Sequence, residues 1–280
     1  MSAMRLLPAG SRRILVELAS LEEAQALFAS LVADPVPEVD EIVPAARTLL
    51  LRFRTGEAPD RAAFAANLRA RDLSGETAAT TREVEIPILY DGEDLGEVSR
   101  LTGLPVEEVI ERHAARDYAV AFTGFAPGFA YLSGGDPALK VPRRQSPRTR
   151  IPPESLAIGG EFSGIYPQAS PGGWQILGRS AVKMFDPNRE PAILLEPGMR
   201  VRFRRLESEA AFEREAAANA ATPVERPQAR PDGTRLEILA APLPALYQDG
   251  GRHGLVGQGI SVSGALDRAS LAEANRLVGN

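Results

Sequence analysis

The chain has 280 residues, of which 44% are hydrophobic and 25% charged, and its formal net charge is −5. This composition is ordinary for a soluble globular protein of two or more domains, and the charge argues against bulk attraction to nucleic acid or anionic membranes. The absence of cysteine excludes disulfides, thiolate nucleophiles and cysteine-ligated zinc. No signal-peptide pattern or apolar run of membrane-spanning length occurs, so we expect a cytoplasmic protein without membrane or nucleic-acid partners.

The first 82 residues show the strand and helix patterns of a small α/β sandwich. Ser20 is a good N-cap residue, and Glu23 completes a capping-box pattern before apolar residues that recur at helical spacing. Asp60 is placed to cap a second helix that should run through Ala70. Strands are expected over residues 12–18, 39–43, 48–53 and 83–90, and the last should lead into the next domain.

Residues 94–116 contain two short helical patterns separated by residues 102–105 (TGLP), an arrangement that resembles a helix-turn-helix. A DNA-reading helix needs positive charge toward the phosphates, whereas the second helix carries Glu107, Glu108 and Glu111. A proline at the helix start followed by glutamates is better explained as N-terminal capping of a packed helix. We therefore expect no DNA binding here.

The chain is organised around residues 122–180, where glycine and proline recur every few positions. Both residues favour turns, because glycine adopts positive φ and proline fixes φ. The same stretch has enough apolar surface to require a core, so we expect short strands joined by specified turns rather than a disordered linker. The apolar residues include Phe122, Phe125, Phe129, Tyr131, Leu132, Ile158, Phe162, Ile165, Tyr166, Trp174, Ile176 and Leu177.

Five cations lie within eleven positions of this stretch: Lys140, Arg143, Arg144, Arg148 and Arg150. Such a loop can simply be solvated. However, prolines at positions 142, 147, 152 and 153 restrict the backbone and would hold Arg143 and Arg148 in fixed directions. Planar guanidinium groups held in this way suit a carboxylate or phosphate, so we predict an anion site containing these two arginines.

Several common catalytic motifs are missing. The chain has no G-x-S-x-G nucleophile elbow and no P-loop, so any ATP site would be atypical. His113, near a helix end, is most simply a helix C-terminal cation or a satisfied core residue. Because His253 is the only other histidine, we expect no metal site built on imidazoles. Trp174, the only tryptophan, is ordinarily a core anchor.

The chain changes character after residue 207. Before that point, strands are expected over residues 181–185, 192–195 and 200–206. Residues 209–221 are alanine-rich and predict a frayed helix, and the proline-rich residues that follow predict a linker over 208–234.

Three motifs within residues 122–180 resemble those of one protein family: GF-x-PGF-x-YL, PRR-x-x-PR and GIYP-x-x-SPGGW-x-x-x-GR. The family comprises the bacterial proteins called allophanate hydrolase subunit 1, carboxyltransferase subdomain C or the B subunit of 5-oxoprolinase. The resemblance implies an α+β chain in which the sandwich of residues 1–82 precedes a cyclophilin-like β-barrel over residues 83–207. One departure is Ile151-Pro152-Pro153-Glu154-Ser155, which replaces the usual V-P-x-G-S and leaves the geometry of that turn open.

The same resemblance implies where the binding residues lie. The family's pockets form where these loops converge, and the side chains expected to line the substrate or anion site are Arg143, Arg148, Tyr166, Gln168, Ser170 and Gln175. The family usually has a histidine a few residues before a tyrosine, and His113 and Tyr118 fit that pattern. His113 is therefore the candidate catalytic residue.

Residues 235–280 resemble the start of the partner family, called allophanate hydrolase subunit 2, carboxyltransferase subdomain D or the C subunit of 5-oxoprolinase. The matching residues are Gln248, Asp249, Gly251, Arg252, Ser263, Gly264, Asp267, Arg268, Asn275 and Asn280. His253 stands where that family generally has proline, so it is given no role. The chain thus resembles a fusion of the two families cut short within a second barrel, and we expect the tail to be mobile or loosely docked.

Three functional hypotheses follow from the resemblance. The first is a component of an ATP-dependent amide or lactam hydrolase similar to 5-oxoprolinase, acting on a small carboxylate substrate and inactive without subdomain D and a third, lactamase-like protein. The second is half of a biotin-dependent carboxyltransferase similar to that of urea carboxylase, and the third is a module that inhibits a histidine kinase. The chain lacks a biotin-carrier lysine motif, which weakens the second, and the fusion favours an enzyme over the third. We therefore expect ATP as the cofactor and no metal.

Overall fold

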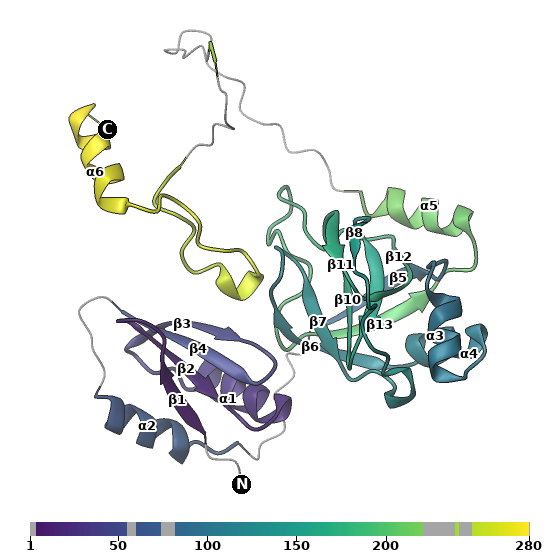
Figure 1. Cartoon of the computed structure of the whole chain (residues 1–280), viewed down its shortest axis with the longest axis horizontal. Coiled ribbons are helices and arrows are strands. Elements are labelled where there is room, and N and C mark those ends of the chain that lie inside the picture. Colours follow the sequence, from purple (N-terminus) through teal and green to yellow (C-terminus); the bar gives the residue numbers. More distant parts are fainter. Residues whose placement is uncertain (1–3, 55–59, 74–81, 221–238, 241–247, 280) are drawn as a thin grey trace.

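The computed structural model describes residues 4–54, 60–73, 82–220, 239–240 and 248–279. Figure 1 shows two folded bodies, an N-terminal α/β domain and a larger β-barrel, with the C-terminal segment beside both. The predicted linker over residues 208–234 lies outside the described residues from position 221 onward, as does Asn280.

The N-terminal domain is an antiparallel sheet of order β1-β2-β4-β3 with two helices packed on one face. Its elements are β1 (Arg5–Pro8), β2 (Arg13–Glu17), α1 (Leu21–Ala33), β3 (Val39–Pro44), β4 (Thr48–Phe53) and α2 (Arg61–Ala70). The strands and helices predicted for this region are confirmed, and β1 is an additional edge strand paired with β2.

Alternation along the strands explains where this domain has its core. Val16 of β2 and Leu49 and Leu51 of β4 are fully buried and meet the apolar faces of both helices, including Leu27 and Leu68. At the start of α1, the Ser20 hydroxyl accepts a hydrogen bond from the Glu23 amide, as the capping-box pattern predicts.

The barrel closes from seven strands in the order β10-β7-β6-β13-β5-β12-β9. These strands are β5 (Glu83–Leu89), β6 (Asp117–Thr123), β7 (Ala130–Ser133), β9 (Ser155–Gly159), β10 (Phe162–Ile165), β12 (Gln175–Ser180) and β13 (Arg200–Arg205). β5 and β13 run parallel, whereas the other barrel pairs are antiparallel. The α+β fold class and the barrel implied by the family resemblance are confirmed.

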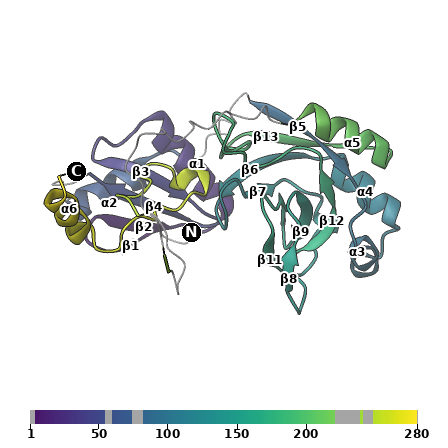
Figure 2. The ribbon, with the colours of Figure 1, turned by 90° about the horizontal axis from the view of Figure 1, so that it is seen from above.

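The helix pair α3 (Leu95–Thr102) and α4 (Val106–Ala114) connects β5 to β6. Val98 and Val109 are fully buried in the barrel's core cluster, so the pair packs on the barrel, as the sequence predicts. Gly103 ends α3 with φ of +74°, a conformation that glycine adopts readily. Figure 2 shows both helices on the side of the barrel away from the N-terminal domain.

A short pair of strands, β8 (Arg148–Ile151) and β11 (Ser170–Gly172), lies outside the closed barrel. A one-turn helix, η1 (Pro137–Leu139), precedes it. Beneath this pair is a second apolar cluster, formed by Ala126, Phe129, Ile151, Ala157, Tyr166, Trp174 and Ile176. The glycine- and proline-rich block therefore folds as ordered short strands and turns around its own core.

The strands predicted over residues 181–185 and 192–195 are absent. The chain is irregular there and has a single bridge between Phe185 and Ile193. Pairing is limited to two backbone hydrogen bonds, from the Asp186 amide to the Ala192 carbonyl at 2.8 Å and from the Leu194 amide to the Met184 carbonyl at 2.9 Å. The prediction was wrong because the two segments meet only beside a tight turn, in which Asp186 accepts from the amides of Asn188 and Arg189, and the pairing ends after these two bonds.

α5 (Glu209–Ala218) packs against the barrel rather than fraying. Glu209 pairs with Arg179 and Glu215 with Arg204, each at 2.7 Å. The Arg179 guanidinium also lies 4.6 Å from the centroid of the Phe212 ring. The alanine-rich stretch is therefore held by arginines of β12 and β13.

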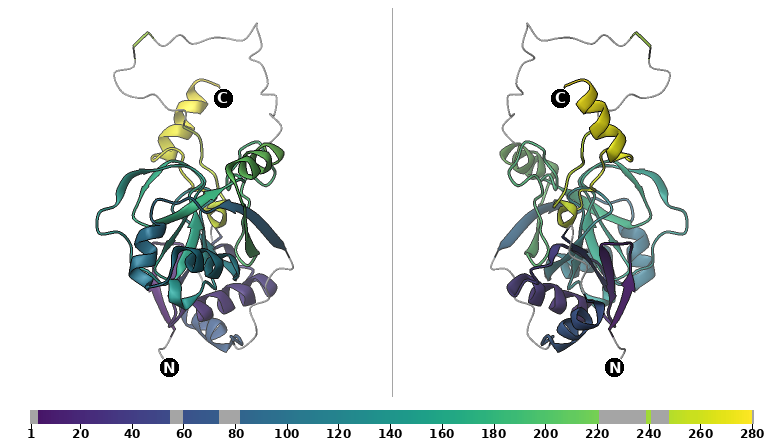
Figure 3. Two further views of the ribbon diagram at one scale, coloured as in Figure 1. Left: turned by 90° about the vertical axis from the view of Figure 1, so that its right-hand side faces the viewer. Right: turned by 90° about the vertical axis from the view of Figure 1, so that its left-hand side faces the viewer.

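The described tail contains a helical turn, η2 (Val256–Gln258), and the helix α6 (Arg268–Leu277). No strand occurs within residues 248–279, although the sequence suggests strands in the tail. α6 has no buried residue, and Figure 3 shows it projecting beyond the two folded bodies. Across the described parts of the chain, no helix has the length and apolar character needed to span a membrane.

Candidate functional site

An aromatic cluster joins the loops that carry the first and third family motifs. Phe129 lies edge-to-face against Tyr131, Tyr166 and Trp174, with ring centroids 5.0, 5.3 and 5.6 Å apart. At the edge of this cluster, Phe125 is 6.0 Å from Tyr166 yet 60% exposed, and its φ is +71°. A left-handed backbone is costly for phenylalanine, so this exposed ring is a candidate binding element.

Two cations of this region, Arg143 and Arg150, form no ion pair within the described residues. Arg143 lies beside Trp174. Its side chain is exposed, and its guanidinium carbon lies 6.0 Å from the centroid of the Trp174 ring, within reach of a cation–π interaction. Among the described residues it has no carboxylate partner. Burial raises the pKa of Tyr166, and the charge of Arg143 opposes that shift. We call the exposed residues Phe125, Arg143 and Gln168 the Trp174 rim.

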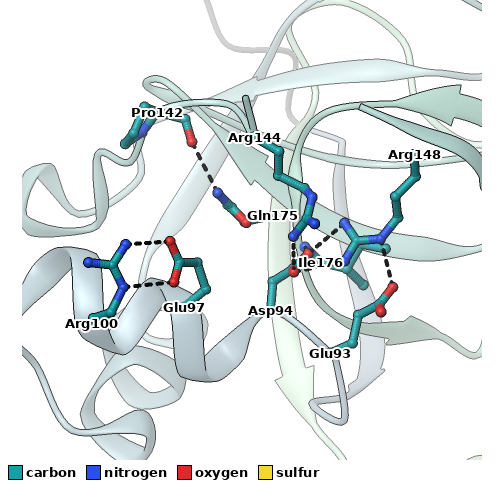
Figure 4. A network of polar contacts seen from close by, with 9 residues as sticks. All are labelled: Glu93, Asp94, Glu97, Arg100, Pro142, Arg144, Arg148, Gln175 and Ile176. Atoms are coloured by element: carbon teal, nitrogen blue, oxygen red, sulfur yellow. Dashed lines mark hydrogen bonds and ion pairs between the residues drawn. The ribbon is translucent and has the colours of Figure 1, made fainter. Parts of the chain in front are cut away.

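Asp94, just before α3, is the buried centre of a polar cluster, shown in Figure 4. Its side chain is 3% exposed and accepts hydrogen bonds from Arg144 Nη1 at 2.7 Å and from the Ile176 amide at 2.7 Å. Both terminal nitrogens of Arg148 donate to the same carboxylate at 2.9 and 2.8 Å, and Arg148 Nε pairs with Glu93 at 2.9 Å. We call Glu93, Asp94, Arg144 and Arg148 the Asp94 cluster.

The Asp94 cluster gives Arg148 an internal partner. Its hydrogen bonds to Asp94 raise the pKa of Arg148, and its guanidinium fork already binds two of the chain's own carboxylates. An external anion would have to displace them. The cluster ties the start of α3 to β8 and β12, so its first role is to anchor the motif loops on the barrel.

Sequence reasoning missed Asp94. An aspartate before a helix is ordinarily an N-cap residue, but the Asp94 side chain makes no capping bond. The signal that could have found it is the arginine-rich PRR-x-x-PR motif, since several constrained arginines need an anion and the chain can supply its own.

The other predicted lining residues are mostly buried. Tyr166 and Gln175 are 3% and 2% exposed, and Gln175 Nε2 donates to the carbonyl of Pro142 at 3.3 Å. Ser170 is buried on β11, and its hydroxyl donates to the Gln168 carbonyl at 3.0 Å. The Gln168 side chain is exposed. The structure thus places all six residues on the loops around the β8–β11 pair, but only Arg143 and Gln168 are exposed.

Two atoms near the Asp94 cluster have unused hydrogen-bonding capacity. Gln175 Oε1 and Arg144 Nε are buried without a partner. Figure 4 shows the Gln175 amide between Pro142 and Arg144. One is an acceptor and the other a donor.

His113 lies apart from these loops, inside the barrel, with 1% exposure. Its Nδ1 is 2.9 Å from the Tyr90 hydroxyl and its Nε2 is 3.0 Å from the Ser163 hydroxyl. Its ring stacks on Phe203 at 5.0 Å, and Tyr118 Oη donates to the His113 carbonyl at 3.0 Å. Burial lowers the pKa of His113 to about 3, so the imidazole is neutral at ordinary pH. This is the environment of a satisfied core histidine.

A cavity of about 500 Å³ lies between the N-terminal domain and the barrel. Residues 20–22 and 46–47 line one side, residues 133–140 and 160–163 line the other, and His113 is among the lining residues. Two of its carboxylates are paired within the chain: Asp136 with Arg112 and Arg116, and Glu161 with Lys140. None of the six residues of the β8–β11 loops lines this cavity, so His113 and those residues belong to separate regions.

Glu154 occupies the turn that departs from the family pattern. Its φ is +60°, a conformation that favours the glycine of the V-P-x-G-S pattern. Its carboxyl group accepts a hydrogen bond from the Met184 amide at 3.2 Å, and burial raises its pKa to about 8. The turn therefore keeps its left-handed geometry, with the glutamate fastened to the following loop.

The Trp174 rim combines an exposed aromatic ring, a free guanidinium and a side-chain amide. Such groups can pack a flat ring, bind an anion and hydrogen-bond an amide. Within the described ranges, no group of three or more histidines, aspartates or glutamates is placed to hold a metal ion. The arrangement supports binding of a small anionic ligand more directly than it supports acid–base chemistry.

A sequence model of the carboxyltransferase domain, subdomain C and D, matches residues 4–195 of the chain. The B subunit of 5-oxoprolinase from Escherichia coli O157:H7 is 38% identical over 191 residues, which cover 67% of this chain and 87% of that protein. The B subunit of 5-oxoprolinase from Bacillus subtilis (strain 168) is 40% identical over 141 residues, covering 49% of this chain and 59% of that protein.

Solved structures match the fold of the chain. The protein TTHA0988 matches with a TM-score of 0.70 and 36% identity over 96% of this chain, which spans only 54% of that longer chain. The urea amidolyase of K. lactis matches with a TM-score of 0.57 and 17% identity over 77% of this chain and 15% of its own, which supports the fold alone. The chain therefore belongs to the carboxyltransferase subdomain C and D family, together with the B subunits of bacterial 5-oxoprolinases.

Proposed function

We propose that this chain is a component of an ATP-dependent lactam hydrolase of the 5-oxoprolinase kind. The net reaction converts 5-oxoproline, ATP and water into glutamate, ADP and phosphate. The observation that carries the proposal is the 38% identity to the B subunit of the E. coli 5-oxoprolinase, across 87% of that protein. Urea amidolyase shares the fold at 17% identity, which gives no specific support to a carboxyltransferase, and nothing in the described structure favours a kinase inhibitor.

The substrate site in this proposal is the Trp174 rim. 5-Oxoproline is a five-membered ring with one carboxylate and one lactam amide. Arg143 would bind the carboxylate through its planar fork, Phe125 would pack against the ring, and the Gln168 amide would hydrogen-bond the lactam group. Because Arg148 is held by Asp94 and Glu93, it would support this site from behind rather than touch the substrate.

His113 would not act as an acid in this site. Both of its ring nitrogens have partners, and a pKa of about 3 leaves it uncharged near pH 7. Its catalytic role remains a prediction, and its geometry favours a positioning role inside the barrel.

A site at the Trp174 rim is open to solvent and needs a second wall. Catalysis requires the reacting groups to be held near their productive positions and shielded from water. We propose that a homologous barrel begun by residues 235–280 supplies this wall and that the enzyme is completed by a third, lactamase-like protein. The match of 96% of this chain to 54% of the longer TTHA0988 supports a continuing second domain. The ATP site is not assigned to residues of this chain.

The test is ADP release with and without 5-oxoproline, measured for residues 1–280, for the chain completed with a full-length second barrel, and for the mixture with the third protein. We expect turnover only in the three-part mixture. Turnover by residues 1–280 alone would refute the shared site. No turnover by the full mixture would refute the lactam hydrolase and return attention to the carboxyltransferase and kinase-inhibitor hypotheses.

A further inference from the structure

Residues 249–265 form a loop that closes on itself, which we call the docking loop. At its neck, the Ala265 amide donates to the Asp249 carbonyl at 2.9 Å and the Arg252 amide donates to the Val262 carbonyl at 2.7 Å. The Asp249 side chain also accepts from the Gly251 amide at 2.8 Å. These bonds fix the loop's shape through its own backbone, as in compact Ω-loops.

The glycines at the neck are required by close packing. A Cβ atom at Gly264 would lie 2.5 Å from the Gly251 amide nitrogen, and one at Gly251 would lie 2.8 Å from the Ser263 carbonyl oxygen. Both residues also have positive φ, at +82° and +90°. The Q-D-x-G-R and V-S-G-A motifs of the tail therefore encode the shape of this loop.

The tip of the docking loop contacts the barrel beside the Trp174 rim. The Thr123 hydroxyl donates to the Gly257 carbonyl, and the Gly128 amide donates to the Gln258 carbonyl at 3.4 Å. Gly259 sits so close to the turn after β6 that a Cβ there would lie 2.8 Å from the Ala126 carbonyl oxygen. The tip thus packs on the turn that carries Phe125.

The other side of the docking loop contacts the N-terminal domain. η2 packs against β3 as well as β6, and Nδ1 of His253 lies 3.5 Å from Nη1 of Arg52 on β4. His253 Nε2 is 3.2 Å from the Gly250 carbonyl, so the tautomer that donates there leaves Nδ1 free to accept from Arg52. The loop therefore bridges the two folded bodies at their junction.

The described residues that follow the loop, 266–279, are mostly exposed. α6 has no buried residue, and the side chains of Leu266, Leu277 and Val278 are 104%, 70% and 74% exposed. The attachment of the described tail is concentrated in the docking loop.

We propose that the docking loop is a preformed plug that seats the C-terminal part of the chain at the junction of the N-terminal domain and the barrel. A loop whose shape is fixed by its own neck loses little conformational entropy when it docks. The C-terminal part is therefore held by the non-covalent contacts of the docking loop. We expect it to stay attached to the folded chain after a cut within residues 221–238. This inference rests on the loop's contacts and is independent of the proposed lactam hydrolase.

The test uses the full chain with a protease recognition site placed within residues 225–235. After cleavage of the native protein, size-exclusion chromatography at decreasing concentration measures whether the fragment carrying the docking loop stays with the rest. We expect the two pieces to elute together. Separation of the wild-type pieces at all concentrations would overturn the proposal.

Two glycine variants separate contact with the barrel from folding of the loop. Gly259→Ala should raise the concentration at which the two fragments separate at least tenfold, because its Cβ would meet the Ala126 carbonyl. Gly254→Ala is the matched control, since Gly254 has φ of +80° but no neighbouring atom within 4 Å. Equal loss in both variants would contradict the proposed seat.

A substitution in the barrel tests the same contact without changing the sequence of the docking loop. Thr123→Val removes the hydroxyl that donates to Gly257 while keeping the side chain's shape, and we expect about threefold to tenfold weaker retention. Unchanged retention in Thr123→Val together with unchanged retention in Gly259→Ala would show that the loop is held elsewhere.

Discussion

The Asp94 cluster and the Trp174 rim take their arginines from the same short motif, PRR-x-x-PR, yet use them in opposite ways. Arg148 is 17% exposed and donates to two carboxylates of its own chain, whereas Arg143, five positions earlier, is exposed and has no carboxylate partner among the described residues. Proline constrains the backbone around both. What separates them is the presence of Asp94 beside one and not the other.

This comparison shows that two arginines of one short motif can have different roles. A buried arginine fork is stable only when its charge is compensated, so the chain supplies Asp94 and Glu93 to hold Arg148. The loop fixed in this way then carries an uncompensated arginine at the surface. On this account Arg148 maintains the shape of the site and Arg143 binds the ligand.

The largest expected effect comes from removing the charge of Asp94. Asp94→Asn keeps the side chain's shape but leaves Arg144 and Arg148 without their common anion, and we expect the free energy of unfolding to fall by about 3–5 kcal/mol. Urea unfolding followed by circular dichroism measures the change.

The matched control is Asp91→Asn. Asp91 also binds an arginine, Arg179 at 2.5 Å, but both side chains are 38% exposed. Pairs in contact with water contribute little, so the loss should stay below about 1 kcal/mol. Equal losses at the two aspartates would show that burial does not distinguish the Asp94 cluster.

A somewhat smaller effect is expected at His113, and it depends on pH. Burial lowers its folded pKa to about 3 from the ordinary 6.5, so the unfolded chain binds a proton between these values and the folded chain does not. Stability is therefore lost as pH falls from 6.5 toward 3. Between pH 7 and pH 4, the free energy of unfolding of the wild type should fall by about 3 kcal/mol more than that of His113→Gln.

Chemical unfolding at several pH values tests this. If the difference in unfolding free energy between the wild type and His113→Gln does not change with pH, the folded protein does not exclude the proton from His113. That result would contradict the lowered pKa.

Much of the fold could be predicted from the sequence because its signals are local. Capping residues, helical spacing and strand alternation located both helices of the N-terminal domain, and the glycine and proline pattern indicated ordered turns around Trp174. The barrel itself came from the family resemblance, because strand pairing between distant segments leaves no local trace.

The site was harder to predict because it depends on pairings across the fold. Arg148 meets Asp94 across 54 positions of sequence, and the Ile176 amide meets the same carboxylate across 82 positions. The turn at Glu154, in contrast, could be identified from the sequence. It departs from the family pattern, and Glu154 has φ of +60°. Residue type predicts an anion site, but only the fold shows which charges are already neutralised.

The central claim is that Arg143 binds the substrate's anion while Arg148 holds the loop. The most direct measurement compares Arg143→Lys and Arg148→Lys in the complete three-part mixture, recording kcat/KM for 5-oxoproline together with the unfolding free energy of each chain. Arg143→Lys should lower kcat/KM about tenfold or more through loss of the bidentate fork, with stability within about 0.5 kcal/mol of the wild type, whereas Arg148→Lys should lower both. Unchanged kcat/KM in Arg143→Lys would contradict the account.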